Sequence, residues 1–210
     1  MATYESLIKI KGAVGDMVFY TLNGKNVVRK KSGFNKAAFK KNPSYEKVRQ
    51  NSSEFGHCSK MGKIIRNSLD LYLKETGDAL LYQKFARLMT EIKDCDTISE
   101  RGKRTVENGL TTEEGKKLLK VFQFGDIDNV SSTDIQNGIL CLKENKEGEK
   151  ATIVTIKLDA ENYTAEKAEE DLSLDRHPVY FKKYFSEADF VLYFMVLKNE
   201  NNEISHMGFV

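Results

Sequence analysis

The chain is poor in the residues that most often carry chemistry. Among its 210 residues there are three cysteines and three histidines, and no P-loop, HExxH or GxSxG motif occurs. Cys58, Cys95 and Cys141 are odd in number, widely spaced and without a CxxC pair, so a disulfide framework is not expected. His57 precedes Cys58 directly, but adjacent residues on a helix point about 100° apart and do not serve each other as base and nucleophile. The sequence therefore predicts a protein that is not an enzyme.

Metal and cofactor sites are not indicated either. His177 and His206 could pair with Cys141 around a metal, but nothing in the spacing of the three favours this over scattered surface side chains. We therefore expect no catalytic residues, no metal ligands and no cofactor.

Long apolar runs are missing as well. The longest, at 190–197, has eight residues, whereas a membrane-spanning helix needs about 20. The first residues alternate apolar side chains with lysine and lack the basic-then-apolar layout of a signal peptide. With 40% hydrophobic and 30% charged residues, the composition is that of a globular protein with a buried core. We expect a cytoplasmic protein without a membrane span.

Charge is divided unevenly along the chain. Residues 1–66 contain fourteen lysines and arginines but only four carboxylates, a net charge of +10, so the remainder carries −8 to give the total of +2. This division indicates a surface for an anionic partner at the front of the chain and an acidic surface behind it. The alternative is that the basic front packs on the acidic back of the same molecule.

The front of the chain has the pattern of a glycine-cornered β-hairpin. Residues 17–22 are rich in β-branched and aromatic side chains, and Asn23-Gly24 is a strong two-residue hairpin signal before a return strand at 25–31. We expect Tyr20 to pair with Val28 across this hairpin. Glycine adopts the backbone angles that tight turns require, so the residues expected to shape the hairpin are Gly12, Gly15 and Gly24.

The basic residues of this region form the predicted binding surface. A further strand is expected at 5–10, where apolar and polar residues alternate, and residues 32–42 form a polar, basic connector closed by Pro43. On the return strand the period of two places alternate cations on one face, which is either a binding surface or a guarded sheet edge. The residues predicted to bind the partner are Lys25, Arg29, Lys30, Lys31, Lys40 and Lys41, with Lys25, Arg29 and Lys31 on one face.

Two amphipathic helices are predicted behind the connector. Apolar residues recur every three or four positions over 61–72 and again over 81–92, with Gly77-Asp78 breaking the run. The short connection favours antiparallel packing, with both apolar stripes in the core. Residues 94–111 have no apolar period and are predicted as a polar linker, after which a short helix runs over 112–119.

From Val121 onward the pattern is that of strands. Residues 190–197 are apolar on both faces, which predicts a central, covered strand. The fold class expected is α+β, with an N-terminal β-hairpin and helical segment at 1–120, followed by a sandwich-like, acidic, antiparallel β module at 121–210. The strands expected in this module are 138–142, 152–158, 179–185, 190–197 and 203–210.

Two segments carry recognisable motifs. Residues 8–33 fit a G-x-x-G-(D/N)-x-x-F-Y hairpin, and residues 42–69 fit an N-x-x-E-F-G helix start; residues 99–109 are weakly similar to the same pattern. In these motifs the chain resembles a family of uncharacterised proteins that is widespread in Bacteroidota. The resemblance covers roughly the first third of the chain and implies ancestry, without an assigned activity. The matching positions are Gly12, Gly15, Asp16, Phe19 and Tyr20, then Asn51, Glu54, Phe55 and Gly56.

The basic front admits two interpretations. Its GxxG lies between strands and not between the helices that flank the backbone-clamping loop of a KH module, so a KH interpretation is poor. Cations interleaved with Phe19, Tyr20, Phe34, Phe39 and Tyr45 are compatible with RNA or DNA binding. A subunit or adaptor of a larger assembly could instead use the hairpin edge for strand addition.

We expect a non-enzymatic interaction or assembly protein whose basic front docks on an acidic protein surface, with nucleic-acid binding as the alternative. The β module would contact a second partner or, as a homo-oligomer, a copy of itself.

Overall fold

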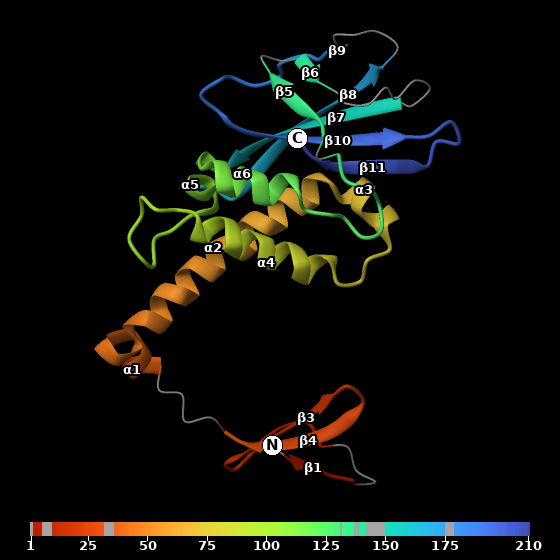
Figure 1. The fold of residues 1–210 in the computed structure, drawn as a ribbon. Coiled ribbons are helices and arrows are strands. Elements are labelled where there is room, and N and C mark those ends of the chain that lie inside the picture. Colours follow the sequence, from red (N-terminus) through yellow and green to blue (C-terminus); the bar gives the residue numbers. More distant parts are fainter. Residues whose placement is uncertain are drawn as a thin grey trace. The chain divides into compact units, whose positions relative to one another are not determined.

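The computed structural model describes residues 2–5, 10–31, 36–130, 132–136, 139–141, 150–174 and 179–210. They form two compact units, Met1–Glu46 and Lys47–Val210. Helices and antiparallel sheets both contribute, so the fold is α+β, with a hairpin sheet first, helices next and antiparallel sheets at the end (Figure 1). The predicted fold class is confirmed. Among the described helices, none combines the length and the apolar character needed to cross a membrane.

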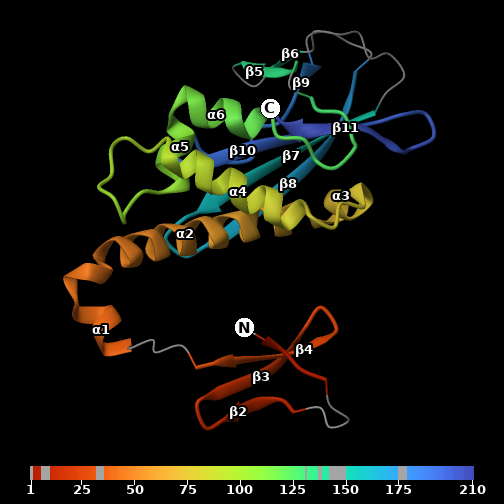
Figure 2. The same ribbon diagram turned by 60° about the horizontal axis from the view of Figure 1, so that its bottom comes forward.

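The first unit is built on a four-stranded antiparallel sheet in the order β1-β4-β3-β2 (Figure 2). The strands are β1 (Ala2–Thr3), β2 (Gly12–Val14), β3 (Met17–Leu22) and β4 (Lys25–Lys30). The expected hairpin is confirmed as β3 and β4, but the expected pairing of Tyr20 with Val28 is wrong by one residue. Tyr20 pairs with Val27, because the two-residue turn places Leu22 opposite Lys25 and thereby sets every other pair. Most of the strand expected at 5–10 lies outside the described residues.

A short helix follows in what the sequence predicted to be a plain connector. Helix α1 (Lys36–Lys41) ends in two lysines, and the 3-10 turn η1 (Pro43–Tyr45) comes directly after it. Lysines in a last helical turn are favourable, because they face the negative end of the helix dipole. The side chain of Asn42 accepts the Ser44 N–H and so caps η1.

The second unit begins with a helical layer. Its apolar stripes are those that the sequence predicted: Met61 and Ile65 on one helix and Phe85 and Ile92 on another are fully buried. Residues 94–111 are not a linker throughout, because their last six residues form a helix of their own. The helices are α2 (Glu46–Ser68), α3 (Asp70–Leu73), the 3-10 turn η2 (Lys74–Thr76), α4 (Leu81–Asp94), α5 (Val106–Thr111) and α6 (Glu113–Lys120).

Behind the helices lies a four-stranded antiparallel sheet in the order β11-β10-β7-β8. As predicted from residues 190–197, β10 is a central strand. Its adjacent residues Phe194 and Met195 point to opposite faces of the sheet, and both are fully buried. Within this sheet, β8 is the strand that the sequence did not predict. The strands are β7 (Lys150–Asp159), β8 (Thr164–Ser173), β10 (Phe190–Lys198) and β11 (Ile204–Phe209).

A small sheet completes the second unit as a third layer, formed by β5 (Asp134–Gln136), β6 (Ile139–Cys141) and β9 (Val179–Tyr180). In Figure 1 the large sheet lies between this small sheet and the helices. One core, which includes Phe85 and Phe194, joins the helices to the sheet, and a second, which includes Leu140 and Met195, joins the two sheets.

The compact units are therefore bounded differently from the expected division into 1–120 and 121–210. The helices of 47–120 share one core with β7, β10 and β11, because their apolar stripes are covered by the face of the sheet.

Candidate functional site

Two tight turns shape the sheet of the first unit. Asn23 and Gly24 join β3 to β4 at φ of 49° and 77°, the two positive angles of a type I′ turn. Gly15, at φ of 54°, opens the two-residue turn between β2 and β3, and Gly12, at φ of 111°, begins β2. Residues other than glycine adopt such angles at a steric cost. Side chains at these glycines would meet open space, so the backbone angle alone favours glycine there.

Cross-strand partners share a face of a sheet, and the register therefore assigns the side chains of this unit. Tyr20 and Val27 lie on one face, flanked along β4 by Lys25 and Arg29. Phe19 and Val28 lie on the other face, as do Met17 and its partner Lys30. Both faces thus combine apolar side chains with cations.

Within the described residues of this unit, neither face of the sheet is packed against a second layer of helices or strands. Among the described residues of Met1–Glu46, Val27 alone is buried. Val14, Met17 and Leu22 are 60%, 40% and 48% exposed. Small sheets gain stability from an apolar face packed on another layer, and a chain of this length buries little surface by itself. The uncovered sheet is the most unusual feature of this unit.

The six cations predicted to bind a partner are all exposed. Lys25 and Arg29 share a face as expected, and Lys31 follows directly after β4, whereas Lys30 points to the opposite face. Lys40 and Lys41 lie in the last turn of α1. Residues 1–46 carry nine lysines and arginines against three carboxylates, a net +6, while residues 47–210 carry 24 against 28, a net −4. The positive charge is therefore spread over the unit and not collected on one face.

The aromatic rings of the first unit are engaged with neighbours. Tyr4 and Phe19 pack edge to face with ring centroids 5.6 Å apart, and Phe39 packs on Tyr45 at 5.7 Å. The guanidinium of Arg29 lies 6.0 Å from the ring centre of Tyr20. Phe34, the remaining aromatic residue noted in the sequence, lies outside the described residues.

A buried cluster of charges in the second unit was not predicted from the sequence. Glu54 on α2 accepts two hydrogen bonds from the guanidinium of Arg104, at 2.9 and 2.8 Å, and one from Lys93 Nζ at 3.0 Å. The Gly102 N–H donates to the same carboxylate at 2.6 Å. The hydrogen bonds from Arg104 lower the pKa of Glu54 to about 2, against the opposing effect of burial. Residues 42–69, which contain Glu54, and residues 99–109, which contain Gly102 and Arg104, meet at this cluster.

Asp96 organises the same loop from its other end. Its carboxylate accepts the N–H groups of Ile98, Ser99 and Thr105 at 2.9–3.0 Å. Burial raises the pKa of Asp96, but these N–H groups outweigh burial and hold it below its usual value. The cluster therefore fixes the loop between α4 and α5.

His57 lies in a second polar cluster beside α5. The Val106 N–H donates to Nε2 at 3.0 Å, Glu107 Oε2 lies 3.0 Å from the same nitrogen, and the Tyr163 hydroxyl lies 3.1 Å from Nδ1. Cys58, its neighbour in sequence, donates instead to the Met89 carbonyl at 3.5 Å. His57 and Cys58 therefore bond to different groups. In the described part of the chain, no group of three or more His, Cys, Asp and Glu side chains is arranged to hold a metal ion.

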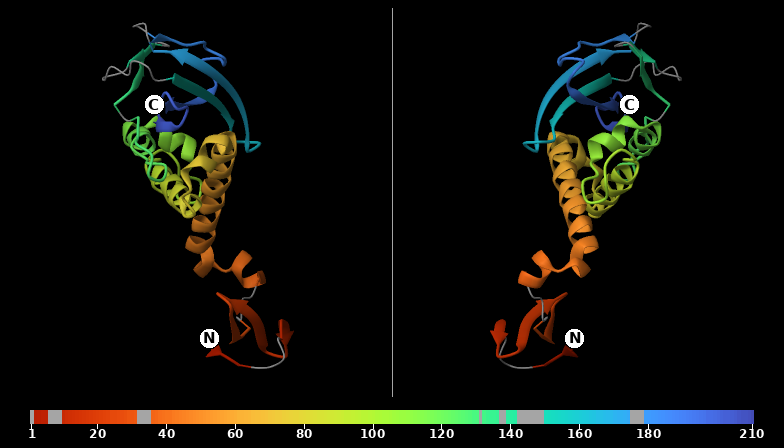
Figure 3. Two further views of the ribbon diagram at one scale, coloured as in Figure 1. Left: turned by 90° about the vertical axis from the view of Figure 1, so that its right-hand side faces the viewer. Right: turned by 90° about the vertical axis from the view of Figure 1, so that its left-hand side faces the viewer.

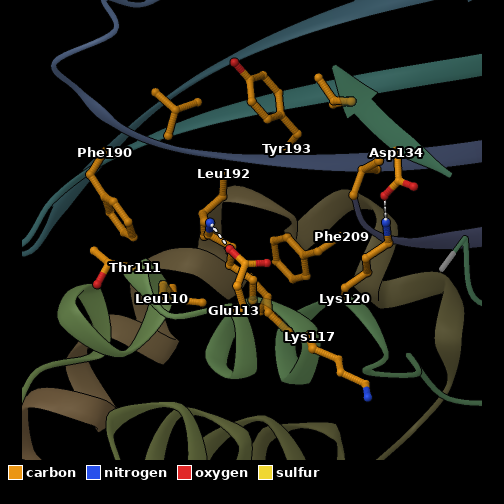
Figure 4. A pocket seen from close by; sticks show the side chains of 15 residues that line it. Leu110, Thr111, Glu113, Lys117, Lys120, Asp134, Phe190, Leu192, Tyr193 and Phe209 are labelled. Atoms are coloured by element: carbon orange, nitrogen blue, oxygen red, sulfur yellow. Dashed lines mark hydrogen bonds and ion pairs between the residues drawn. The ribbon is translucent and has the colours of Figure 1, made fainter. Parts of the chain in front are cut away.

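A groove of about 790 Å³ lies between α6 and the sheet (Figure 4). Leu192 and Phe209 form part of its apolar lining. Its cations are largely engaged: Lys116 pairs with Glu113 at 2.8 Å, Lys120 pairs with Asp134, and Lys117 extends away from the cavity. Ligand sites of this size combine apolar walls with a few converging polar groups. Four charged side chains of the described lining pair with one another, so the groove is a weak candidate.

Comparison of the chain with models of protein families, with curated proteins and with solved structures finds no match.

Proposed function

We propose that the protein is a non-enzymatic interaction or assembly protein whose first unit docks on an anionic partner, as a subunit or adaptor of a larger complex. The observation that carries this proposal is a four-stranded sheet with one buried side chain among its described residues and a net charge of +6 over 1–46. A partner that covers a face of this sheet would bury Met17, Val14 or Leu22 and would place its carboxylates against the surrounding cations.

The docking surface is a face of the sheet and not its edge. The outer strands β1 and β2 have two and three residues, so strand addition there would form few main-chain hydrogen bonds. Apolar side chains beside isolated cations are typical of a protein interface, in which an apolar centre is surrounded by a polar rim.

A protein partner fits these faces better than RNA or DNA. Single-stranded nucleic acid binds through exposed aromatic rings on which bases stack, whereas Phe19 and Phe39 pack on rings of the same unit. Nucleic-acid binding through the same cations is the competing outcome of the experiment below.

The other properties proposed here rest on the cysteines and the charge distribution. Cys58, Cys95 and Cys141 are free thiols, which a reducing compartment maintains, and we assign the protein to the cytoplasm. The acidic second unit would contact a second partner or a copy of itself.

The test is to isolate the tagged full-length chain from its native host at low salt, with and without nuclease. The variant K25E/R29E/K30E reverses three cations of the sheet. The matched control K103E/K116E/K117E makes the same charge change at three exposed lysines of the second unit. Proteins are quantified by mass spectrometry and nucleic acid by absorbance at 260 nm.

We expect a stoichiometric protein that resists nuclease, that remains with the control variant and that is lost from K25E/R29E/K30E. Material that nuclease removes would replace this proposal with nucleic-acid binding. A partner that both variants retain would show that the first unit is not the docking surface.

A further inference from the structure

Strand β8 forms one outer edge of the large sheet in the second unit. Over its ten residues, Thr164–Ser173, it pairs in the described part of the chain with β7 alone. Figure 3 shows β8 along the outer side of this sheet, with β7 next to it. Because alternate N–H and C=O groups of a strand point to opposite sides, half of the backbone groups of β8 point away from β7.

This edge has few of the features by which proteins usually block further pairing. Its register with β7 runs without a shift from Lys150 opposite Ser173 to Asp159 opposite Thr164, so no bulge bends it, and it contains no proline. The opposite edge is different: the register of β10 with β11 shifts between Leu197 and Lys198, and Asp128 forms a bridge to His206 on the outer side of β11. Long, regular, open edges are templates for an added strand.

The side chains of β8 favour an added strand that is positively charged. Four carboxylates and one lysine, Lys167, lie within its ten residues. Glu166 and Glu170 lie on one face, with Glu169 and Asp171 on the other, so an added strand would meet negative charge on both of its faces. Lys167 bonds to Glu169 at 2.7 Å, and this is the only ion pair of these carboxylates within the described chain.

The same charges disfavour pairing of β8 with β8 of a second copy. An antiparallel β8 pair would set carboxylates opposite or diagonal to carboxylates, and like charges across a ladder are destabilising. A strand that carries lysine or arginine at alternate positions forms favourable opposite-charge pairs across the ladder instead. If the carboxylates of β8 serve only to prevent aggregation, a basic strand would be attracted by charge but would form no main-chain hydrogen bonds with β8. Binding measurements can distinguish these two cases.

We propose that β8 is a docking strand, which binds an extended segment of a partner protein that carries lysine or arginine at alternate positions, by strand addition. The contact is independent of the proposed role of the first unit. Main-chain hydrogen bonds supply the affinity and the four carboxylates supply the preference for a basic segment.

The test uses a fluorescent ten-residue peptide in which lysine alternates with threonine and valine, with binding to the full-length chain followed by anisotropy. A second peptide has glutamate in place of every lysine. Two further lysine peptides carry backbone N-methyl groups, one on its odd-numbered and the other on its even-numbered residues. Each therefore loses the N–H donors along one edge of the peptide strand and keeps those along the other.

We expect the lysine peptide to bind at least tenfold more tightly than the glutamate peptide, and N-methylation in only one of the two methylated peptides to weaken binding at least tenfold. The backbone amides of β8 should become more protected from hydrogen exchange when the lysine peptide is bound. The variant E166Q/D171N should weaken binding, whereas E187Q/E200Q, which neutralises two exposed carboxylates elsewhere in the second unit, should not.

Three results would overturn the proposal. The first is equal affinity for the two N-methylated peptides, which would show charge attraction without strand pairing. The second is an equal loss of affinity for the lysine peptide in E166Q/D171N and in E187Q/E200Q. The third is no binding of the lysine peptide at millimolar concentration.

Discussion

The guanidinium of Arg104 holds the carboxylate of Glu54 through two parallel hydrogen bonds, from Nε to Oε1 at 2.9 Å and from Nη2 to Oε2 at 2.8 Å. Glu54 lies within α2, and Arg104 lies in the loop between α4 and α5. The contact therefore joins two parts of the chain that are far apart in sequence. The side chain of Glu54 is 2% exposed. Charge-assisted, bidentate pairs of this kind are among the stronger hydrogen-bonded contacts in proteins.

The first prediction concerns stability in acid. The pKa of Glu54 is lowered from 4.5 to about 2, chiefly by Arg104, so its contribution to the free energy of unfolding is complete above pH 4.5. This contribution, on the order of 3 kcal/mol, is lost as the pH falls through about 2. In the variant E54Q, Arg104 and Lys93 lack their carboxylate, and we expect a loss of about 3 kcal/mol at pH 7.

Urea unfolding at pH 7, 4.5, 3 and 2 measures both effects. The native chain should lose more stability between pH 4.5 and 2 than E54Q loses, and the control E200Q, at an exposed carboxylate, should behave as the native chain does. Parallel curves for the native chain and E54Q would show that Glu54 is not ionised in the way described.

The second prediction compares two helical glycines. A Cβ at Gly109 would lie 2.0 Å from the Ile92 carbonyl oxygen, whereas a Cβ at Gly56 would meet nothing within 4 Å. We expect G109A to lower the free energy of unfolding by about 2–3 kcal/mol, because α5 must move away from α4. G56A should raise it by up to about 1 kcal/mol, because alanine is the better helix former. Thermal and denaturant unfolding of the two variants measure the difference, and a destabilised G56A would contradict the open surroundings of Gly56.

The third prediction concerns the thiols. Burial raises the pKa of Cys58 to about 11, and it also raises the pKa of Cys95. Cys141 is exposed. Since the thiolate is the reactive form, a thiol reagent at pH 7.5 should modify Cys141 first, Cys95 more slowly and Cys58 only on unfolding. Peptide mapping after timed quenching gives the order, and modification of Cys58 as fast as Cys141 would show that the core around α2 is open.

The parts of the fold that the sequence predicts are those determined by residues close together in the chain. The Asn23-Gly24 turn is determined by two adjacent residues, and the apolar stripes of α2 and α4 repeat within a few turns. Strand β10 was recognisable because both of its faces are apolar, which follows from its position between the helical core and the second core.

Strand β8 could not be predicted in this way. Its sequence, TAEKAEEDLS, is rich in residues that favour helices, and it becomes a strand through its pairing with β7 along ten positions. Helix α5 was missed for a related reason: it has six residues in a polar stretch, and its start depends on the Thr105 side chain, which accepts the Asn108 N–H.

The candidate site was predictable in composition but not in arrangement. The six cations are exposed, as a binding surface requires, yet a single strand places Arg29 and Lys30 on opposite faces. Among the described residues of the first unit, the burial of Val27 alone is a property of the whole sheet and cannot be predicted from any one strand.

The measurement that tests the central claim most directly is hydrogen exchange of the full-length chain, free and bound to the partner that it retains in the isolation experiment. A partner that covers the sheet of the first unit should slow the exchange of amides in β3 and β4 at least tenfold, while amides in the core of α4 exchange as before. Unchanged exchange in β3 and β4, with protection gained only within residues 47–210, would contradict the docking role of the first unit.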